Sequence, residues 1–135
     1  MSDGDGLHVE LVAADRLVWS GEAKMVIART TEGDVGILPN HAPMLSLMVD
    51  GVVDVTTSDG ETWVAAVDAG FLSVAANRIS ILSEHAQMSH DVDLESARAD
   101  LERARAAGEV DDEAEQAAAR AWAEARIRAA EQSTT

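Results

Sequence analysis

Short runs of alternating apolar and polar residues fill the first two thirds of the chain. Leu7, Val9 and Leu11 fall on one face of an extended segment at 7–13, because successive side chains of a strand point to opposite faces. The same alternation predicts strands at 24–30, 35–38, 51–57, 61–67, 70–75 and 78–83. Turn residues such as Asp59-Gly60 separate these runs, and no helical crossover lies between them. This pattern predicts an antiparallel sandwich or barrel.

The pattern changes after His90, where β-branched residues become rare and the apolar spacing becomes helical. Residues Leu94, Ala97, Leu101 and Ala104 predict a helix over 94–107. Its predicted caps are Asp93 and Gly108, and the predicted capping box of a second helix is Asp112 with Glu115. The expected inner side of the second helix consists of Ala118, Ala121, Trp122, Ala125 and Ala129. The fold class is therefore mainly β plus α, with an N-terminal antiparallel β-sandwich domain at 1–88 and a C-terminal antiparallel two-helix hairpin at 89–135.

The expected inner face of this hairpin is mostly alanine. Alanine favours helix strongly, but it buries little apolar area. We therefore expect helices that form readily and hold only loosely to the sandwich. Two interpretations stay open, a hairpin that merely stabilises the domain and a hairpin that can undock or extend.

Composition and charge exclude several classes of function. The chain has 135 residues and a formal net charge of −15, which opposes binding to nucleic acid or to an anionic membrane face. The acidity serves either solubility or the steering of a partner. Cysteine is absent, which excludes disulfides and thiol catalysis, and no apolar run is long enough for direct membrane insertion. We expect a soluble chain that reaches a membrane only through a partner.

A search for catalytic chemistry gives little. The four histidines form no metal-ligand spacing, and no nucleophile elbow, phosphate loop or dinucleotide motif is present. We therefore predict no catalytic residue and no metal site, and no enzyme activity for the chain alone. The alternative from the residues is a small hydrolase that uses His41 and Asp68, which requires these two side chains to meet in a pocket.

The run from Gly33 to Leu45 is the most constrained part of the sequence. It holds Pro39 and Pro43, the only prolines of the chain, and each restricts the residue before it to extended backbone. We expect the chain to leave a strand near Leu38, to turn rigidly, and to enter apolar structure again at Met44.

Several motifs of this chain resemble the epsilon subunit of bacterial F-type ATP synthases. The main motif is the run 32–43, which resembles the family's acidic-Gly-acidic-apolar-Gly-Ile-apolar-Pro-Gly-His-Ala-Pro signature. Asn40 replaces the frequent glycine there, and asparagine tolerates a left-handed backbone. The runs 7–12, 18–21 and 68–74 resemble other family motifs in the same order. The resemblance spans residues 7 to about 107, and the second helix matches by position only.

The resemblance implies a non-catalytic central-stalk subunit of the rotor. Its sandwich would bind the gamma subunit and sit on the ring of c subunits, at the cytoplasmic face of the bacterial cell membrane as a peripheral protein. The family positions that face the ring or gamma match Glu32, Gly33, Asp34 and His41. For His41, a hydrogen-bonded residue that holds the turn is the competing interpretation. A free-standing β-sandwich binding module with a helical interaction tail is the alternative for the whole chain.

The resemblance also implies a regulatory hairpin. In the family it can extend along gamma and inhibit ATP hydrolysis, with basic residues that meet an acidic segment of the beta subunit within the alpha and beta head. The matching residues are Arg120, Arg126 and Arg128, against the alternative of solvated surface with Glu124 and Arg128 as an ordinary pair. Some members bind ATP as a regulatory ligand, and the matching residues are Glu95 and Arg98. Glu95 stands where the family has Asp, which would disturb that contact. No other cofactor is implied.

Overall fold

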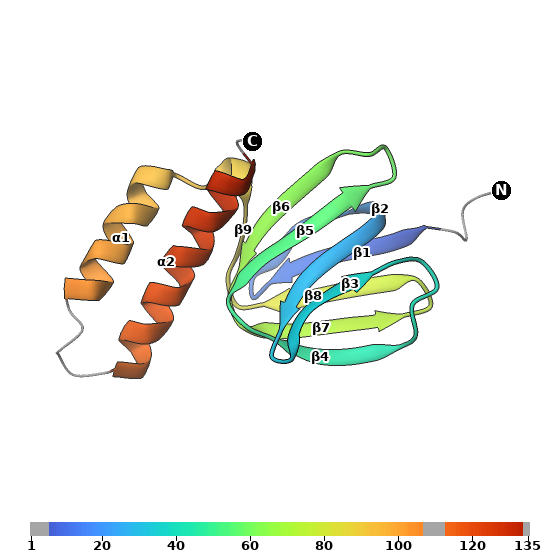
Figure 1. The fold of residues 1–135 in the computed structure, drawn as a ribbon, viewed down its shortest axis with the longest axis horizontal. Coiled ribbons are helices and arrows are strands. Elements are labelled where there is room, and N and C mark those ends of the chain that lie inside the picture. Colours follow the sequence, from blue (N-terminus) through green and yellow to red (C-terminus); the bar gives the residue numbers. More distant parts are fainter. Residues whose placement is uncertain (1–5, 107–112, 134–135) are drawn as a thin grey trace.

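The structure is a computed structural model that describes residues 6–106 and 113–133. Its first part consists of β-strands, and its second part consists of helices (Figure 1). The strands are β1 (Leu7–Ala13), β2 (Arg16–Thr30), β3 (Gly33–Ile37), β4 (Met44–Met48), β5 (Gly51–Thr57), β6 (Thr62–Val67), β7 (Gly70–Ala75), β8 (Arg78–Ser83) and β9 (Ala86–Met88).

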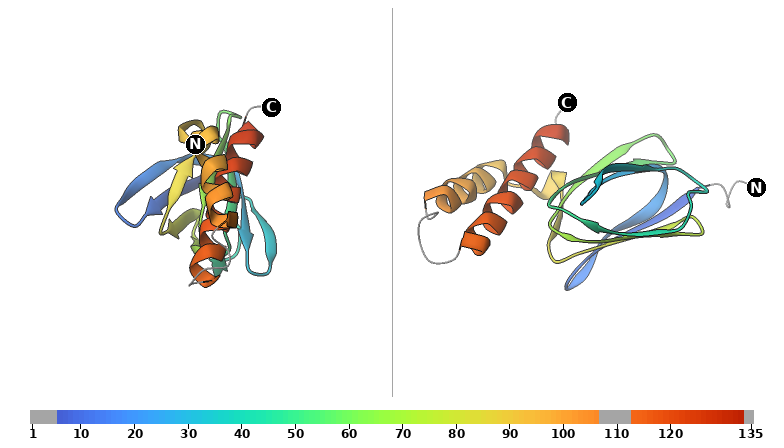
Figure 2. Two further views of the ribbon diagram at one scale, coloured as in Figure 1. Left: turned by 90° about the vertical axis from the view of Figure 1, so that its left-hand side faces the viewer. Right: turned by 60° about the horizontal axis from the view of Figure 1, so that its bottom comes forward.

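The strands form two layers that share the long strand β2. The first half of β2 pairs with β1, and its second half pairs with β3 and β5. One layer continues from β1 through β8 and β7 to β4, with β1 and β8 parallel and the other pairs antiparallel. The other layer continues from β5 through β6 to β9. The predicted β-sandwich is thereby confirmed, and Figure 2 shows the two layers facing each other.

The space between the layers is filled by aliphatic side chains. Leu7, Ile37, Leu72 and Ile81 are completely buried there, and they come from both layers. Burial of apolar surface is worth about 25 cal/mol per Å², so branched side chains of this size supply most of the domain's stability. The alternation read from the sequence places these residues on the inner face.

The helices follow a short 3₁₀ turn at Ser89–Asp91. They are α1 (Leu94–Ala106) and α2 (Glu113–Ser133). The Asp93 carboxylate accepts a hydrogen bond from the Ser96 amide at 3.1 Å, which confirms the predicted cap. Helix α2 packs on β5 and β6, and α1 lies on the far side of α2 from the sandwich (Figure 1).

The structure corrects the predicted strands in some places. β2 begins at Arg16 rather than at residue 24, because the polar residues of its first half lie on the exposed face beside β1. The sequence prediction also missed β4 and β9, since β4 carries leucines on its outer face and β9 is too short to show alternation. The predicted caps Gly108 and Asp112 lie outside the described residues.

The predicted inner side of α2 is partly wrong. Ala125 and Ala129 are buried as predicted, whereas Ala118 is exposed, because the sandwich covers only the second half of the helix.

Candidate functional site

The turn between β2 and β3 carries the acidic residues of the signature run. Gly33 has φ of +116°, a backbone conformation that side chains rarely adopt. The Thr30 hydroxyl donates to the Gly33 carbonyl at 2.8 Å and accepts from the Glu32 amide at 3.1 Å. Asp34 pairs with Arg29 across the two strands, with 3.2 Å between carboxylate oxygen and Nε. The turn therefore presents the exposed Glu32 on a backbone that is fixed by its own hydrogen bonds.

The second turn of the signature run joins β3 to β4 at the opposite end of these strands. Asn40 has φ of +70°, which confirms the predicted left-handed backbone. Its amide donates to the side-chain oxygen of Asn77 at 2.6 Å, which ties this turn to the β7–β8 turn. The His41 ring nitrogen Nδ1 lies 2.7 Å from the Ala42 carbonyl oxygen, as expected of a residue that holds the turn. The structure does not bring His41 together with Glu32, Gly33 and Asp34.

Asp68 belongs to a separate cluster. It lies in the turn before β7, at the opposite end of that strand from the Asn77 contact, so His41 and Asp68 do not converge. The predicted hydrolase alternative is therefore wrong in its geometry. The Asp68 carboxylate accepts from the Ser83 hydroxyl at 2.5 Å and from the His85 amide at 2.9 Å, and its second oxygen lies 2.7 Å from His85 Nδ1.

The same cluster brings together three possible metal-ligand atoms, one each from Asp68, Glu84 and His85, within 4.8 Å of one another. The Ser83 hydroxyl donates to Asp68 and is buried, and its oxygen does not contact the His85 ring in the described hydrogen bonds. A hydroxyl nucleophile needs its base within hydrogen-bond reach, and Ser83 with the His85 ring does not meet this condition in the described hydrogen bonds. The bonds of the Ser83 hydroxyl to Asp68 and to the His85 carbonyl instead hold the β6–β7 turn on the β8–β9 turn. Nearby, burial raises the pKa of Asp50, and the charge of Asp68 raises it further, against the Ala69 amide that donates to Asp50 and lowers it.

The outer face of the β1–β8–β7–β4 layer carries large apolar residues that sequence reasoning missed. Leu47 of β4 stands opposite Phe71 of β7, which stands opposite Leu82 of β8. The row continues through Val12 of β1 to Leu17 of β2. Leu47, Phe71, Leu82 and Leu17 are each about half exposed, at 47–56%, and Leu45 is 74% exposed. The sequence signal that could have indicated this exposed surface is a run with apolar residues on both faces of the strand, as in 44–48.

The opposite layer is covered by the hairpin. Ala125 and Ala129 of α2 pack on Val64 and Ala66 of β6, with Trp122 and Val52 partly buried at the edge of the contact. The Gln132 side-chain amide donates to the Asp54 carboxylate at 2.7 Å. Burial raises the pKa of Asp54, the bond from Gln132 lowers it, and the charge of Asp34 raises it.

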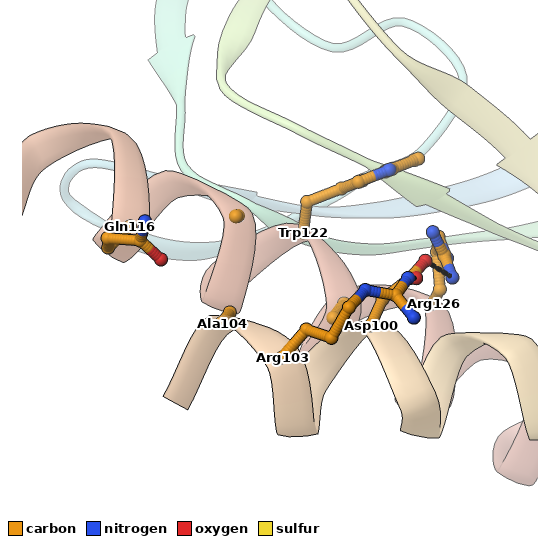
Figure 3. Close-up of a pocket in the computed structure, with 8 residues that line it drawn as sticks. Asp100, Arg103, Ala104, Gln116, Trp122 and Arg126 are labelled. Carbon is orange, nitrogen blue, oxygen red and sulfur yellow. Dashed lines mark hydrogen bonds and ion pairs between the residues drawn. The ribbon is translucent and has the colours of Figure 1, made fainter. Parts of the chain in front are cut away.

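The basic residues predicted for the hairpin lie in different surroundings. Arg126 is largely buried, pairs with Asp100 of α1 at 2.8 Å and lies 5.9 Å from the centre of the Trp122 ring (Figure 3). Arg120 and Arg128 are exposed, and Glu124 contacts Arg105 of α1 at 4.0 Å rather than forming the expected pair with Arg128.

The residues predicted for ATP lie near the start of α1. Arg98 pairs with Glu131 of α2 at 3.4 Å, and Glu95 is exposed. The structure therefore does not bring Glu95 and Arg98 together in a described contact.

Comparison with known proteins identifies the family. The chain matches the family model "ATP synthase, Delta/Epsilon chain, beta-sandwich domain" over residues 6–89. The ATP synthase epsilon chain of Streptomyces avermitilis is 55% identical over 103 residues, which cover 76% of this chain and 83% of that protein. The epsilon chain of Corynebacterium efficiens is 46% identical over 129 residues, which cover 95% of each.

Solved structures share the fold at low sequence identity. A chain of the Euglena gracilis mitochondrial ATP synthase superposes with a TM-score of 0.73 at 22% identity, covering 97% of this chain and 82% of that one. A chain of the Tetrahymena thermophila mitochondrial ATP synthase gives a TM-score of 0.61 at 18% identity, covering 96% of each. Within residues 6–106 and 113–133, no helix is long and apolar enough to cross a membrane. The match over 6–89 and the identity to these epsilon chains lead to one conclusion, that this chain belongs to the ATP synthase epsilon-chain family.

Proposed function

We propose that this chain is a non-catalytic subunit of the central stalk of an F-type ATP synthase, where it links the gamma subunit to the ring of c subunits. The observation that carries this proposal is the exposed apolar row on the β1–β8–β7–β4 layer. Contiguous apolar surface on a soluble domain marks a site of protein association. The family membership identifies the partner to be tested first.

The apolar row is the surface that we assign to gamma. The hairpin covers the other layer, so the row is the open sheet face of the folded chain. Leu47, Phe71 and Leu82 form its centre, where buried anchors contribute most to affinity.

The β2–β3 turn is the surface that we assign to the c-ring. Glu32 is exposed there on a backbone fixed by Thr30 and Gly33, and such a rigid turn suits the transmission of torque. His41 lies in the other turn, with its ring nitrogen 2.7 Å from the Ala42 carbonyl oxygen, and its contact with the ring or with gamma stays a prediction. The chain would therefore sit at the cytoplasmic face of the membrane as a peripheral protein held by its partners.

The hairpin is the proposed regulator of ATP hydrolysis. In the docked form Arg126 is bonded to Asp100, so only the exposed Arg120 and Arg128 could meet an acidic partner without movement. An inhibitory contact with the beta subunit through all three arginines requires the hairpin to open.

Substitution in the apolar row tests the proposal directly. We expect Phe71→Lys to abolish co-purification with gamma, because it places a charge in the centre of the buried contact. Lys24→Glu, a charge change on the exposed side of β2, is the matched control and should leave binding intact. Normal gamma binding by Phe71→Lys would contradict the assignment and favour a free-standing binding module.

Removal of the hairpin tests its regulatory role separately. Deletion of residues 91–135 should leave assembly intact and raise ATP hydrolysis by the complex. Unchanged hydrolysis would show that the hairpin of this chain is not inhibitory.

A further inference from the structure

Two turns of the sandwich bring a histidine and two carboxylates together. Asp68 lies in the β6–β7 turn, and Glu84 and His85 lie in the β8–β9 turn. Each of the three offers one ligand atom, and these atoms lie within 4.8 Å of one another. Across the described ranges 6–106 and 113–133, no other group of three or more histidine and acidic side chains meets so closely. The fold thus assembles a set of possible metal ligands that no spacing in the sequence reveals.

The Asp68 carboxylate is held with one oxygen occupied and the other facing His85. Its Oδ1 accepts from the Ser83 hydroxyl at 2.5 Å and from the His85 amide at 2.9 Å. Its Oδ2 lies 2.7 Å from the ring nitrogen Nδ1 of His85. The Asp68 side chain is only 16% exposed. Carboxylates that bind metals are commonly oriented by such outer hydrogen bonds, so Oδ2 is the oxygen that can reach an ion.

The backbone that carries the other two ligands is fixed as well. The Asp68 amide donates to the His85 carbonyl at 3.2 Å, and the Ala14 amide donates to the Glu84 carbonyl at 3.3 Å. The side chains of Glu84 and His85 are exposed and can adjust on this backbone. Bonds from Zn²⁺ to nitrogen and oxygen are about 2.0–2.2 Å long, so two ligands of one ion lie at most about 4.4 Å apart. A small rotation of the Glu84 side chain therefore completes the set.

The surroundings of the cluster suit a hydrated cation. A surface groove of about 300 Å³ includes Asp15, Arg16, Glu84 and His85 in its lining. All four are exposed, so water can supply the remaining coordination positions of an ion. With Asp68 at its edge, the groove has three carboxylates against one guanidinium. This excess of negative charge favours a cation over an anion.

We propose that Asp68, Glu84 and His85 form a binding site for Zn²⁺. An imidazole nitrogen and two carboxylate oxygens are ligands that Zn²⁺ accepts, with water in the fourth position. The imidazole favours Zn²⁺ over Mg²⁺ and Ca²⁺, which prefer oxygen ligands alone. On binding, the ion takes the place of the proton that His85 Nδ1 shares with Asp68 Oδ2, and that proton leaves to solvent. The three residues lie outside the sets that we assign to gamma and to the c-ring, so the inference does not rest on the proposed function.

Calorimetric titration of Zn²⁺ into the full-length chain, in the presence of millimolar Mg²⁺, tests the proposal. The Mg²⁺ competes for diffuse acidic surface, which a chain of net charge −15 offers widely. We expect a single saturable site for each chain. We also expect Zn²⁺ to raise the thermal unfolding midpoint, because an ion that binds the folded chain stabilises it. The absence of saturable binding, or its loss on addition of Mg²⁺, would overturn the proposal.

Substitution of the two exposed ligands locates the site. His85→Gln should weaken Zn²⁺ binding by about a hundredfold or more, because the loss of an outer hydrogen-bond partner alone costs about 10–100-fold in metal affinity. Glu84→Gln should weaken it by about tenfold, because the amide oxygen can still reach the ion but carries no charge. Both side chains are exposed, so the unfolding midpoints without Zn²⁺ should stay close to that of the wild type.

His8→Gln is the matched control. His8 also lies beside carboxylates, 2.9 Å from Glu22 and 3.8 Å from Glu10, but the described chain forms no group of three ligand atoms within 4.8 Å there. The variant should therefore bind Zn²⁺ as tightly as the wild type. Equal losses for His8→Gln and His85→Gln would show that general negative charge holds the ion, and wild-type affinity of His85→Gln would likewise contradict the proposed site.

Discussion

The sandwich and the hairpin of this chain are stabilised by contacts of different kinds. The sandwich buries large branched side chains between two layers, whereas the hairpin buries mainly alanines on both sides of α2. An alanine offers a single methyl group, so the hairpin loses far less apolar contact when it separates than the sandwich would. We therefore expect that separation of the hairpin from the sandwich costs less free energy than unfolding of the sandwich. Substitutions in each part can test that comparison.

Leu72→Ala should give the largest effect. Leu72 is completely buried in the sandwich, and removal of such a side chain costs about 2–5 kcal/mol of unfolding free energy. Urea unfolding would measure this loss as a lower midpoint. Phe71→Ala is the control, because its side chain points to the outer face and is half exposed. Similar losses for both variants would break the distinction between the two faces of β7.

Gly70→Ala should also destabilise the sandwich, by about 1–3 kcal/mol. An added Cβ would lie 2.0 Å from the Leu82 carbonyl oxygen, so β7 and β8 must move apart. Gly36→Ala is the matched control, because its added Cβ meets no atom within 4 Å. Thermal unfolding of both variants checks the expectation, and an unchanged midpoint for Gly70→Ala would contradict the close approach of the strands.

Ala129→Leu should undock the hairpin and leave the sandwich folded. Ala129 is completely buried against β6, so the larger side chain overpacks the contact by about 1–2 kcal/mol. The cost of overpacking cannot exceed the free energy of docking, because separation of the hairpin from the sandwich would relieve it. Trp122 fluorescence in a Trp19→Phe, Trp63→Phe background would report the separation. Ala118→Leu, on the exposed part of α2, should leave the signal unchanged.

Asp54→Asn should have the smallest effect, a gain of about a few tenths of a kcal/mol in the free energy of unfolding at pH 7 after allowance for solvent screening. Burial raises the pKa of Asp54 in the folded chain, against the hydrogen bond from Gln132 that lowers it, so the charged form is disfavoured there relative to the unfolded chain. The wild type therefore gains stability as the pH falls toward the ordinary value of 3.8, and the advantage of the variant should shrink there. The asparagine oxygen can still accept from Gln132. Urea unfolding at pH 7 and at pH 4 measures the difference, and a variant advantage that grows on acidification would contradict this sign.

Much of the fold followed from the sequence because its periodicity is local. The inward residues Leu7, Val9 and Leu11 were predicted from alternation, and the Asp93 cap was predicted from its place before the helical repeat. β4 was missed because Leu45 and Leu47 face outward beside the inward Met48, so the strand lacks alternation. Whether an apolar face stays exposed depends on whether another element packs on it, and no local pattern in the sequence reveals that.

The candidate sites were predicted less completely. The sequence indicated Glu32, Gly33, Asp34 and His41 as one docking edge, but strand β3 places His41 at the other end from the acidic turn. It also indicated Arg120, Arg126 and Arg128 of the hairpin, and among the described ion pairs only Arg126 has a partner, Asp100 of the other helix. The contacts of these residues with other subunits stay predictions.

By itself, the sequence determined a β-sandwich followed by an alanine-rich hairpin, and it determined the rigid run with two prolines, because strand alternation, helical spacing and backbone restriction act over a few residues. Only the tertiary structure decided which face of the sandwich stays open and that Arg126 is largely buried against Asp100. These features depend on residues far apart in the chain, and their positions are fixed only when the layers and helices pack.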